Sequence, residues 1–220
     1  MPAAILARAA VPLLAILLTT ASAQTSLVAV QADQTCAVTG PVCILVVPDG
    51  SGMAFSEARD LAGDIVDATI GVQLIGCDEY DCYGPVYAYP AEDIWLQPAD
   101  PHTSGCAQPH VAIPDHATDV AGWTEFAAAP RAGGWAEGPV QVYVAGAPGG
   151  AGGLFDIPSL PIAFNSPDLN GDLRVDLTDV ALFAHDLGAG YAFRSDLSWD
   201  GQLDLSDIAV FVAHLGAGCE

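Results

Sequence analysis

An acidic pattern that occurs twice near the C-terminus, at a spacing of 28 residues, constrains this chain more than any other feature. The two copies are Asp168–Asp179 and Asp196–Asp207. Each places oxygen-bearing side chains at positions 1, 3, 5, 9 and 12 and an aliphatic residue at position 8. An apolar stretch follows each copy and ends at a glycine. This order predicts a loop and then a short helix, repeated once.

The residue types in the loops are those that bind a hard cation. Ca²⁺ takes about six to eight oxygen ligands, which a loop of this kind supplies from those side chains and from the backbone carbonyl at position 7. The predicted ligands of the first loop are Asp168, Asn170, Asp172, Asp176 and Asp179, with the carbonyl of Arg174. Those of the second are Asp196, Ser198, Asp200, Asp204 and Asp207, with the carbonyl of Gln202. We therefore expect two Ca²⁺ sites.

The second loop is the better match to this pattern. Position 6 usually needs a left-handed backbone, which costs a residue other than glycine roughly 1–2 kcal/mol. Gly201 occupies this position in the second loop, whereas Leu173 occupies it in the first. We expect Leu173 to be strained and the second site to bind more tightly.

Taken together, these residues resemble the dockerin module of bacterial secreted proteins, in its type I form. The resemblance covers roughly residues 163–219. It implies a small all-α pair of EF-hand-like units that binds Ca²⁺ and attaches the protein to a cohesin-like or cell-surface protein. In dockerins, loop positions 10 and 11 contact the partner, and here these are Leu177, Thr178, Leu205 and Ser206. Leucine at position 10 departs from the hydroxyl or small residue common in dockerins.

The first 23 residues predict export. Arg8 precedes an apolar run too short to span a membrane, and Ala21-Ser22-Ala23 forms a small-residue cleavage site. The mature chain is expected to begin near Gln24, after cleavage at Ala23-Gln24, and to be secreted to the extracellular space.

Export suits the six cysteines, which an oxidising compartment can join in three disulfides. Sequence alone leaves the pairing open. The short spacings Cys36–Cys43 and Cys77–Cys82 are first guesses, and they leave Cys106 for Cys219.

The charge balance excludes some partners. The chain has 27 acidic residues against five basic ones, for a formal net charge of -22. Such a surface repels nucleic acid and anionic membranes. Hydrophobic residues make up 52% of the chain, so it is not a disordered acidic tail.

The N-terminal region predicts short strands. Val66–Leu74 and Val140–Val144 alternate apolar with polar or small residues, and turns rich in glycine and proline separate such runs. Thr118–Phe126 resembles the motif before a late strand of bacterial immunoglobulin-like domains. The expected fold class is mainly β: an Ig-like antiparallel β-sandwich over residues 24–162, after a signal peptide of 1–23, and a dockerin-like EF-hand pair over 163–220.

No catalytic constellation emerges from the sequence. Ser51 lies between glycines, but Asp49 replaces the first glycine that a nucleophile elbow needs. Adjacent acids such as Glu92 and Asp93 are typical of a solvated surface. We expect no enzyme activity.

Three functions remain open at this point. The leading hypothesis is a secreted, non-catalytic calcium-binding protein that uses the dockerin-like module for extracellular or cell-surface attachment. The first alternative is an accessory component or enzyme of polysaccharide degradation, with carbohydrate as a ligand. The second is a structural surface protein in which calcium only stabilises the fold.

Overall fold

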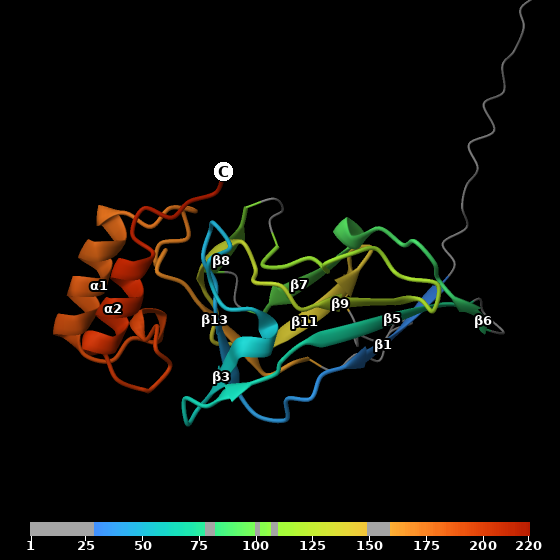
Figure 1. The fold of residues 1–220 in the computed structure, drawn as a ribbon, viewed down its shortest axis with the longest axis horizontal. Coiled ribbons are helices and arrows are strands. Elements are labelled where there is room, and N and C mark those ends of the chain that lie inside the picture. Colours follow the sequence, from blue (N-terminus) through green and yellow to red (C-terminus); the bar gives the residue numbers. More distant parts are fainter. Residues whose placement is uncertain (1–28, 78–81, 100–101, 107–109, 149–158) are drawn as a thin grey trace, which may run out of the picture.

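A computed structural model describes residues 29–77, 82–99, 102–106, 110–148 and 159–220. The expected signal peptide lies outside the described residues. The described part is a β-rich body with two helices, α1 (Leu177–Ala189) and α2 (Leu205–Ala213), gathered at one end (Figure 1). No helix among these residues has the length and apolar character needed to cross a bilayer.

Four small sheets make up the body. In the first sheet, β5 (Ile70–Cys77) pairs antiparallel with β1 (Ala29–Thr35) along one edge. Along its other edge it pairs antiparallel with β6 (Cys82–Pro85) and with β9 (Trp123–Phe126). The second has the order β13 (Ile162–Asn165), β2 (Val42–Leu45), β3 (Ala58–Asp60), β4 (Ile65–Val66). The third has the order β12 (Ala147–Pro148), β11 (Val140–Val144), β7 (Ile94–Pro98), and the fourth pairs β10 (Ala132–Trp135) with β8 (His102–Gly105).

Short 3₁₀ turns complete the framework of elements. They are η1 (Phe55–Glu57), η2 (Ala91–Asp93) and η3 (Phe193–Ser195). The last of these immediately precedes the second acidic loop, and its final residue is Ser195. It therefore fixes the point at which the chain enters that loop.

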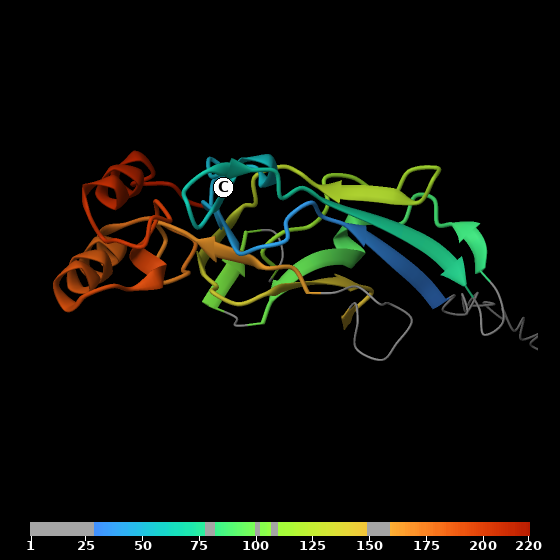
Figure 2. The same cartoon turned by 90° about the horizontal axis from the view of Figure 1, so that it is seen from below.

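The expected Ig-like sandwich followed by an EF-hand pair is wrong. An EF-hand pair needs a helix on each side of each loop, but the described residues hold only two helices longer than a single turn, one after each loop. Strand β13 leads into the first loop instead (Figure 2). It pairs with β2 in parallel, which an all-antiparallel sandwich does not contain. Because this strand partner lies far away in the sequence, the local pattern did not reveal it.

Strand β2 is buried on both faces. Successive side chains of a strand point to opposite sides. Val42 and Ile44 of β2, and Val46 just after it, accordingly join the core of the body. Leu45, and Val47 beyond the end of the strand, point the other way and join a second core. This second core contains Leu169, Val175, Phe183, Leu197 and Phe211 from the loops and helices.

The loops and helices therefore complete their core with residues of the body. The expected domain boundary between residues 162 and 163 falls inside β13, which forms part of the sheet of the body. For brevity, residues 166–220 are called the loop–helix module below. The module follows directly from a strand of the body, and its apolar core includes Leu45 and Val47 of the body.

Two disulfides are present, Cys77–Cys82 and Cys106–Cys219. Both pairings were among the first guesses from the sequence. The third guess, Cys36–Cys43, is wrong, because both cysteines are free thiols. Cys36 packs against the core of the body, whereas Cys43 lies on the buried strand β2 and alternates with the side chains that enter that core. The two thiols thus lie on different sides of β2.

Candidate calcium site: two equivalent acidic loops

The two loops fold around their first residue in the same way. In the first loop, the Asp168 carboxylate accepts hydrogen bonds from the backbone N–H of Asp172 at 3.2 Å and of Leu173 at 2.8 Å. In the second, Asp196 accepts from the N–H of Asp200 at 3.2 Å and of Gly201 at 2.9 Å. The repeat in the sequence is therefore a repeat in backbone geometry.

The last residue of each loop closes it in the same manner. Asp179 accepts from the N–H of Asn170 at 3.2 Å and of Asp176 at 2.9 Å. Its counterpart Asp207 accepts from the N–H of Ser198 and of Asp204, each at 2.9 Å. Position 12 thereby ties the start of each loop to the start of the following helix.

The helices begin where position 9 caps them. Asp176 accepts from the N–H of Thr178, and Asp204 accepts from the N–H of Ser206, each at 2.7 Å. An aspartate at this position satisfies an N–H that the first helical turn leaves unpaired. The carboxylates at positions 9 and 12 thus stabilise the helix as well as the loop.

Each loop contains two left-handed residues, and only one of them is glycine. At position 6, φ is 70° for Leu173 and 79° for Gly201. The left-handed backbone expected there is confirmed. At position 4, φ is 71° for Gly171 and 58° for Trp199. Because each loop strains one residue that is not glycine, the strain at Leu173 does not rank one loop above the other.

The carboxylates at both ends of each loop are buried. Asp168, Asp179 and Asp207 are 0% exposed, and Asp196 is 1% exposed. Among the described residues, the ion pairs within 4 Å belong to Asp186 and not to the loop acids. Burying a carboxylate without an opposite charge costs several kcal/mol. The negative charge of these carboxylates is therefore unfavourable unless they are protonated or bind a cation.

The pKa values show the same electrostatic tension. Burial, together with the nearby negative charges of Asp179 and Asp172, raises the pKa of Asp168 to about 6, although hydrogen bonds from the backbone oppose the shift. Burial also raises the pKa of Asp179 and of Asp196, and the carboxylates of Asp172 and Asp207, respectively, add to the effect. The loops therefore hold negative charge that the protein alone neutralises poorly.

One further oxygen atom lacks a partner. Ser198, at position 3 of the second loop, has a buried hydroxyl oxygen without a hydrogen bond. A buried polar atom without a partner is costly and demands an explanation. A cation bound in the loop would provide one, since position 3 supplies a ligand in loops of this kind.

The donor set fits Ca²⁺ in kind, but the side chains do not enclose an ion as they stand. Among the described residues, no group of three or more His, Cys, Asp or Glu side chains is placed to hold a metal ion. The amide of Asn170 donates to Asp172 at 2.9 Å, so two expected ligands contact each other. Arg174 and Gln202 are at position 7, where only the backbone carbonyl is expected to serve. Bringing the exposed carboxylates inward would complete the ligand set.

The first loop lies against the fourth sheet of the body. The N–H of Gly134, in β10, donates to the backbone carbonyl of Asp168 at 2.8 Å. A side chain at the neighbouring Gly133 would collide with the Asp168 carboxylate. This role of Gly133 could not be predicted from the sequence, because the contact joins residues far apart in the chain. This close approach explains why Asp168 is fully buried.

Two polar side chains outside the second loop, Asn165 and Tyr191, hold its first residue, Asp196. The sequence carries no signal for either contact. The Asn165 amide, at the end of β13, donates to the backbone carbonyl of Asp196 at 2.7 Å. The Tyr191 hydroxyl donates to the Asp196 carboxylate at 3.1 Å. Burial and the adjacent Asp196 carboxylate raise the pKa of Tyr191 to about 12, so its hydroxyl keeps the proton it donates.

An ion pair links α1 to the turn before the second loop. The Arg194 guanidinium donates to both carboxylate oxygens of Asp186, at 2.7 and 2.8 Å. The Ser195 hydroxyl donates to the same carboxylate at 2.8 Å. The hydrogen bonds from Arg194 hold the pKa of Asp186 well below its usual range. The cluster thus orders the segment between the two loops.

The expected partner-binding residues lie on the surface. Leu177 is 78% exposed and Leu205 is 79% exposed, at equivalent first positions of the two helices. Thr178 and Ser206 are exposed next to them. All four are accessible, and two large apolar side chains remain in water.

The Ser51 hydroxyl contacts both a carboxylate and an imidazole. It lies 2.6 Å from the Asp49 carboxylate and 3.0 Å from Nδ1 of His214, in the exposed contact between the β2–β3 loop and the end of α2. Asp49 contacts the serine rather than the histidine, so it does not orient the imidazole as a general base requires.

Comparisons with protein-family models, with curated proteins and with solved structures find no match to this chain.

Exchanging the residues at position 6 should change stability in opposite directions. Gly201→Leu should lower the free energy of unfolding by roughly 1–2 kcal/mol, because a side chain is strained at positive φ. Leu173→Gly should raise it, by less than about 1 kcal/mol, since glycine also gains entropy when unfolded. Urea denaturation at fixed calcium concentration measures both. Gly40→Leu, in open space without positive φ, is the control and should change it by about 0.5 kcal/mol or less. Equal changes at both loop positions would contradict the account.

Proposed function

We propose that this chain is a secreted, non-catalytic protein that binds one Ca²⁺ in each acidic loop and uses the loop–helix module for attachment. The observation that carries the proposal is the pair of fully buried carboxylates in each loop, Asp168 with Asp179 and Asp196 with Asp207. Their burial without a basic partner favours a bound cation over a solvated acidic turn.

The donors available in each loop support Ca²⁺ over other metals. Each loop brings four aspartates, one further oxygen side chain at position 3 and a backbone carbonyl at position 7. Ca²⁺ prefers oxygen ligands in a flexible arrangement, whereas zinc prefers nitrogen and sulfur. Calcium would supply the positive charge that these oxygens lack. The remainder of the loop, including the backbone N–H groups that hold Asp168 and Asp196, would orient the donors.

The most direct role for calcium is to stabilise the joint between module and body. The loops present Leu169, Val175 and Leu197 to the second core, where they meet Leu45 of β2 and Val47 just after it. Without a bound cation, repulsion between the loop carboxylates would oppose this packing. Calcium would then favour the folded module and its contact with the body at the same time.

Attachment to a partner is a second candidate role, and the two exposed leucines favour it. Leu177 and Leu205 lie at equivalent positions of the two helices, and both apolar side chains are largely exposed. Exposed apolar groups of this kind mark protein contacts when they gather in one place. A cohesin-like or cell-surface protein is the proposed partner.

Two features support export and the absence of catalysis. Two disulfides suit an oxidising compartment, in agreement with the signal peptide expected from the sequence. Ser51 contacts both Asp49 and His214, but the carboxylate is bonded to the serine and not to the imidazole that it would have to orient. We therefore propose a binding protein rather than an enzyme of polysaccharide degradation.

Calcium should bind at two sites and stabilise the full mature chain, residues 24–220. At a free concentration 1,000 times the dissociation constant, each site should add about 4 kcal/mol to the free energy of unfolding. Isothermal titration should count two sites, and Asp179→Asn and Asp207→Asn should each remove one. The exposed Asp64→Asn is the matched control and should leave two. No heat of binding, with equal melting temperatures in calcium and in chelator, would overturn the calcium proposal.

The leucine pair should be required for attachment. In calcium, the immobilised chain should bind a purified cohesin module, and the double variant Leu177→Glu/Leu205→Glu should lose that binding because charge replaces the apolar contact. Leu61→Glu, at a site 68% exposed on the body, is the control. Surface plasmon resonance over a panel of cohesins measures this. If no cohesin binds, or if the double variant binds equally well, the attachment role fails and the calcium proposal remains.

A further inference from the structure

We propose that the C-terminal segment Gly216–Cys219, anchored by the Cys106–Cys219 disulfide, positions the first loop and sets its calcium affinity without setting that of the second. This segment is called the clasp below. The inference rests on the proposed binding of calcium, and it adds a determinant of affinity that lies outside both loops.

The clasp lies along the middle of the first loop and forms hydrogen bonds with it. The N–H of Val175 donates to the carbonyl of Ala217, and the N–H of Gly216 donates to the carbonyl of Val175, each at 2.9 Å. The N–H of Cys219 donates to the carbonyl of Leu173 at 3.3 Å. Together these bonds cover loop positions 6 to 8.

Position 7 lies at the centre of this pairing. Arg174 forms an antiparallel bridge with Gly218 of the clasp. Its backbone carbonyl is the one expected to bind Ca²⁺ in loops of this kind. A backbone ligand cannot be turned by a side-chain rotation, so its direction depends on how the chain is held. Here it is held by the clasp and by the hydrogen bond that the Arg174 N–H donates to the Asp172 carboxylate at 3.1 Å.

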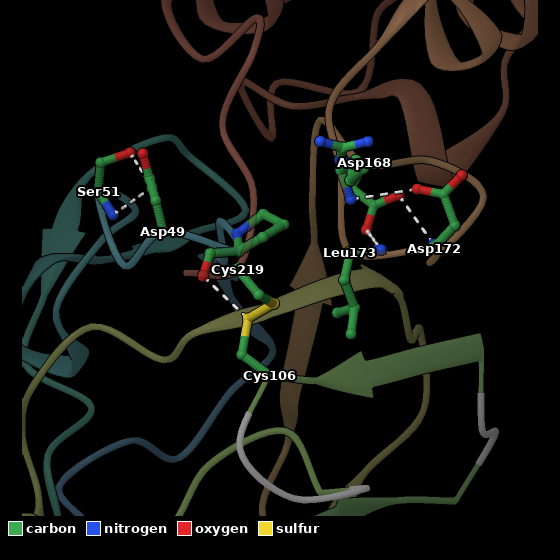
Figure 3. Close-up of a disulfide and its surroundings, with 9 residues drawn as sticks. Asp49, Ser51, Cys106, Asp168, Asp172, Leu173 and Cys219 are labelled. Atoms are coloured by element: carbon green, nitrogen blue, oxygen red, sulfur yellow. Dashed lines mark hydrogen bonds between the residues drawn. A yellow bond between two sulfur atoms is a disulfide. The ribbon is translucent and has the colours of Figure 1, made fainter.

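The disulfide closes the clasp onto the sheet that holds the start of the same loop. Cys106 follows β8 directly, and its N–H donates to the carbonyl of Arg131 at 2.9 Å. Strand β8 pairs with β10, and β10 in turn bonds to Asp168 through Gly134. The start and the middle of the first loop are thus tied to one two-stranded sheet. Figure 3 shows the disulfide beside Leu173 and Asp168.

The strained backbone of the first loop is a reason to expect that this anchorage affects calcium binding. Leu173 has a positive φ, which the chain adopts only where its surroundings enforce it. Its carbonyl accepts the bond from Cys219, so the last residue of the clasp contacts the strained residue itself. Without the disulfide, the loop would visit other conformations, and calcium binding would have to restore the order. Preorganisation of this kind raises affinity by removing that cost.

The second loop has no such support. In the described part of the chain, the backbone hydrogen bonds of the clasp go to the first loop, apart from the one that the Ala217 N–H donates to His214 just after α2, and none reaches the equivalent positions Gly201–Leu203. The side chains of Asn165 and Tyr191 hold the second loop instead. The clasp therefore acts on one site.

The test measures each site alone in the full mature chain. Asp207→Ala isolates the first loop and Asp179→Ala isolates the second. In the first background, adding Cys106→Ser/Cys219→Ser should weaken calcium binding roughly tenfold, or about 1.4 kcal/mol. In the second background, the same pair should leave the affinity unchanged within about twofold. Isothermal titration with CaCl₂ gives both affinities.

Two further variants separate the clasp from general instability. Cys77→Ser/Cys82→Ser removes the other disulfide, at the β5–β6 turn, and should leave the calcium affinity of the first loop unchanged. Two glycines inserted between Gly218 and Cys219 keep the Cys106–Cys219 disulfide but make the clasp longer and more flexible. This insertion should lower the calcium affinity of the first loop as the Cys106→Ser/Cys219→Ser pair does. That variant serves if the serine pair does not fold.

The outcomes distinguish this inference from the proposed function. If the isolated first loop binds no calcium with the disulfide intact, the proposed function fails at that loop. If it binds and neither clasp variant weakens it, or if both loops weaken equally, the inference is overturned.

Discussion

Burial of β2 on both faces is the constraint on which the rest of the structure depends. One face of the strand and the extended residues after it, with Val42, Ile44 and Val46, completes the core of the body. The other face, with Leu45 and Val47, completes the core beneath the acidic loops. At roughly 25 cal/mol per Å² of apolar surface, neither core can be opened cheaply. The loops are therefore pressed against the body, and their end carboxylates lose contact with water. That loss makes a bound cation the natural complement of the fold.

Because of this arrangement, we propose that the module stabilises the body in addition to any role in attachment. A free-standing attachment module would carry its own core and would join the body through a linker. Here β13 enters the sheet of the body, Gly134 bonds to Asp168, and a disulfide returns the C-terminus to β8. Calcium in the loops would stabilise the body as well as the helices. The exposed pair Leu177 and Leu205 would still face outward, so the same module can brace the fold and present a docking surface.

The sequence predicted the parts of the fold that depend on local chemistry. The repeated acids predicted two loops with a left-handed position 6, each followed by a helix, and the alternation in Val140–Val144 predicted β11. It did not predict the strain at Trp199, because tryptophan carries no signal for positive φ. The parallel pairing of β13 with β2 and the contact of Gly133 with Asp168 were also missed. Both join segments distant in the chain, and the resemblance implied a separate all-α module rather than one joined to a strand of the body.

Hydrogen exchange of the full mature chain, compared in calcium and in chelator, tests most directly whether calcium braces the joint. The account predicts that chelation lowers the protection of amides in both loops and, with them, in β2, β10 and β13 of the body. Amides of β5 and β11, which lie away from the joint, should keep theirs. If chelation exposes only the loops and helices while β2, β10 and β13 remain fully protected, the module is independent of the body and the central claim is wrong.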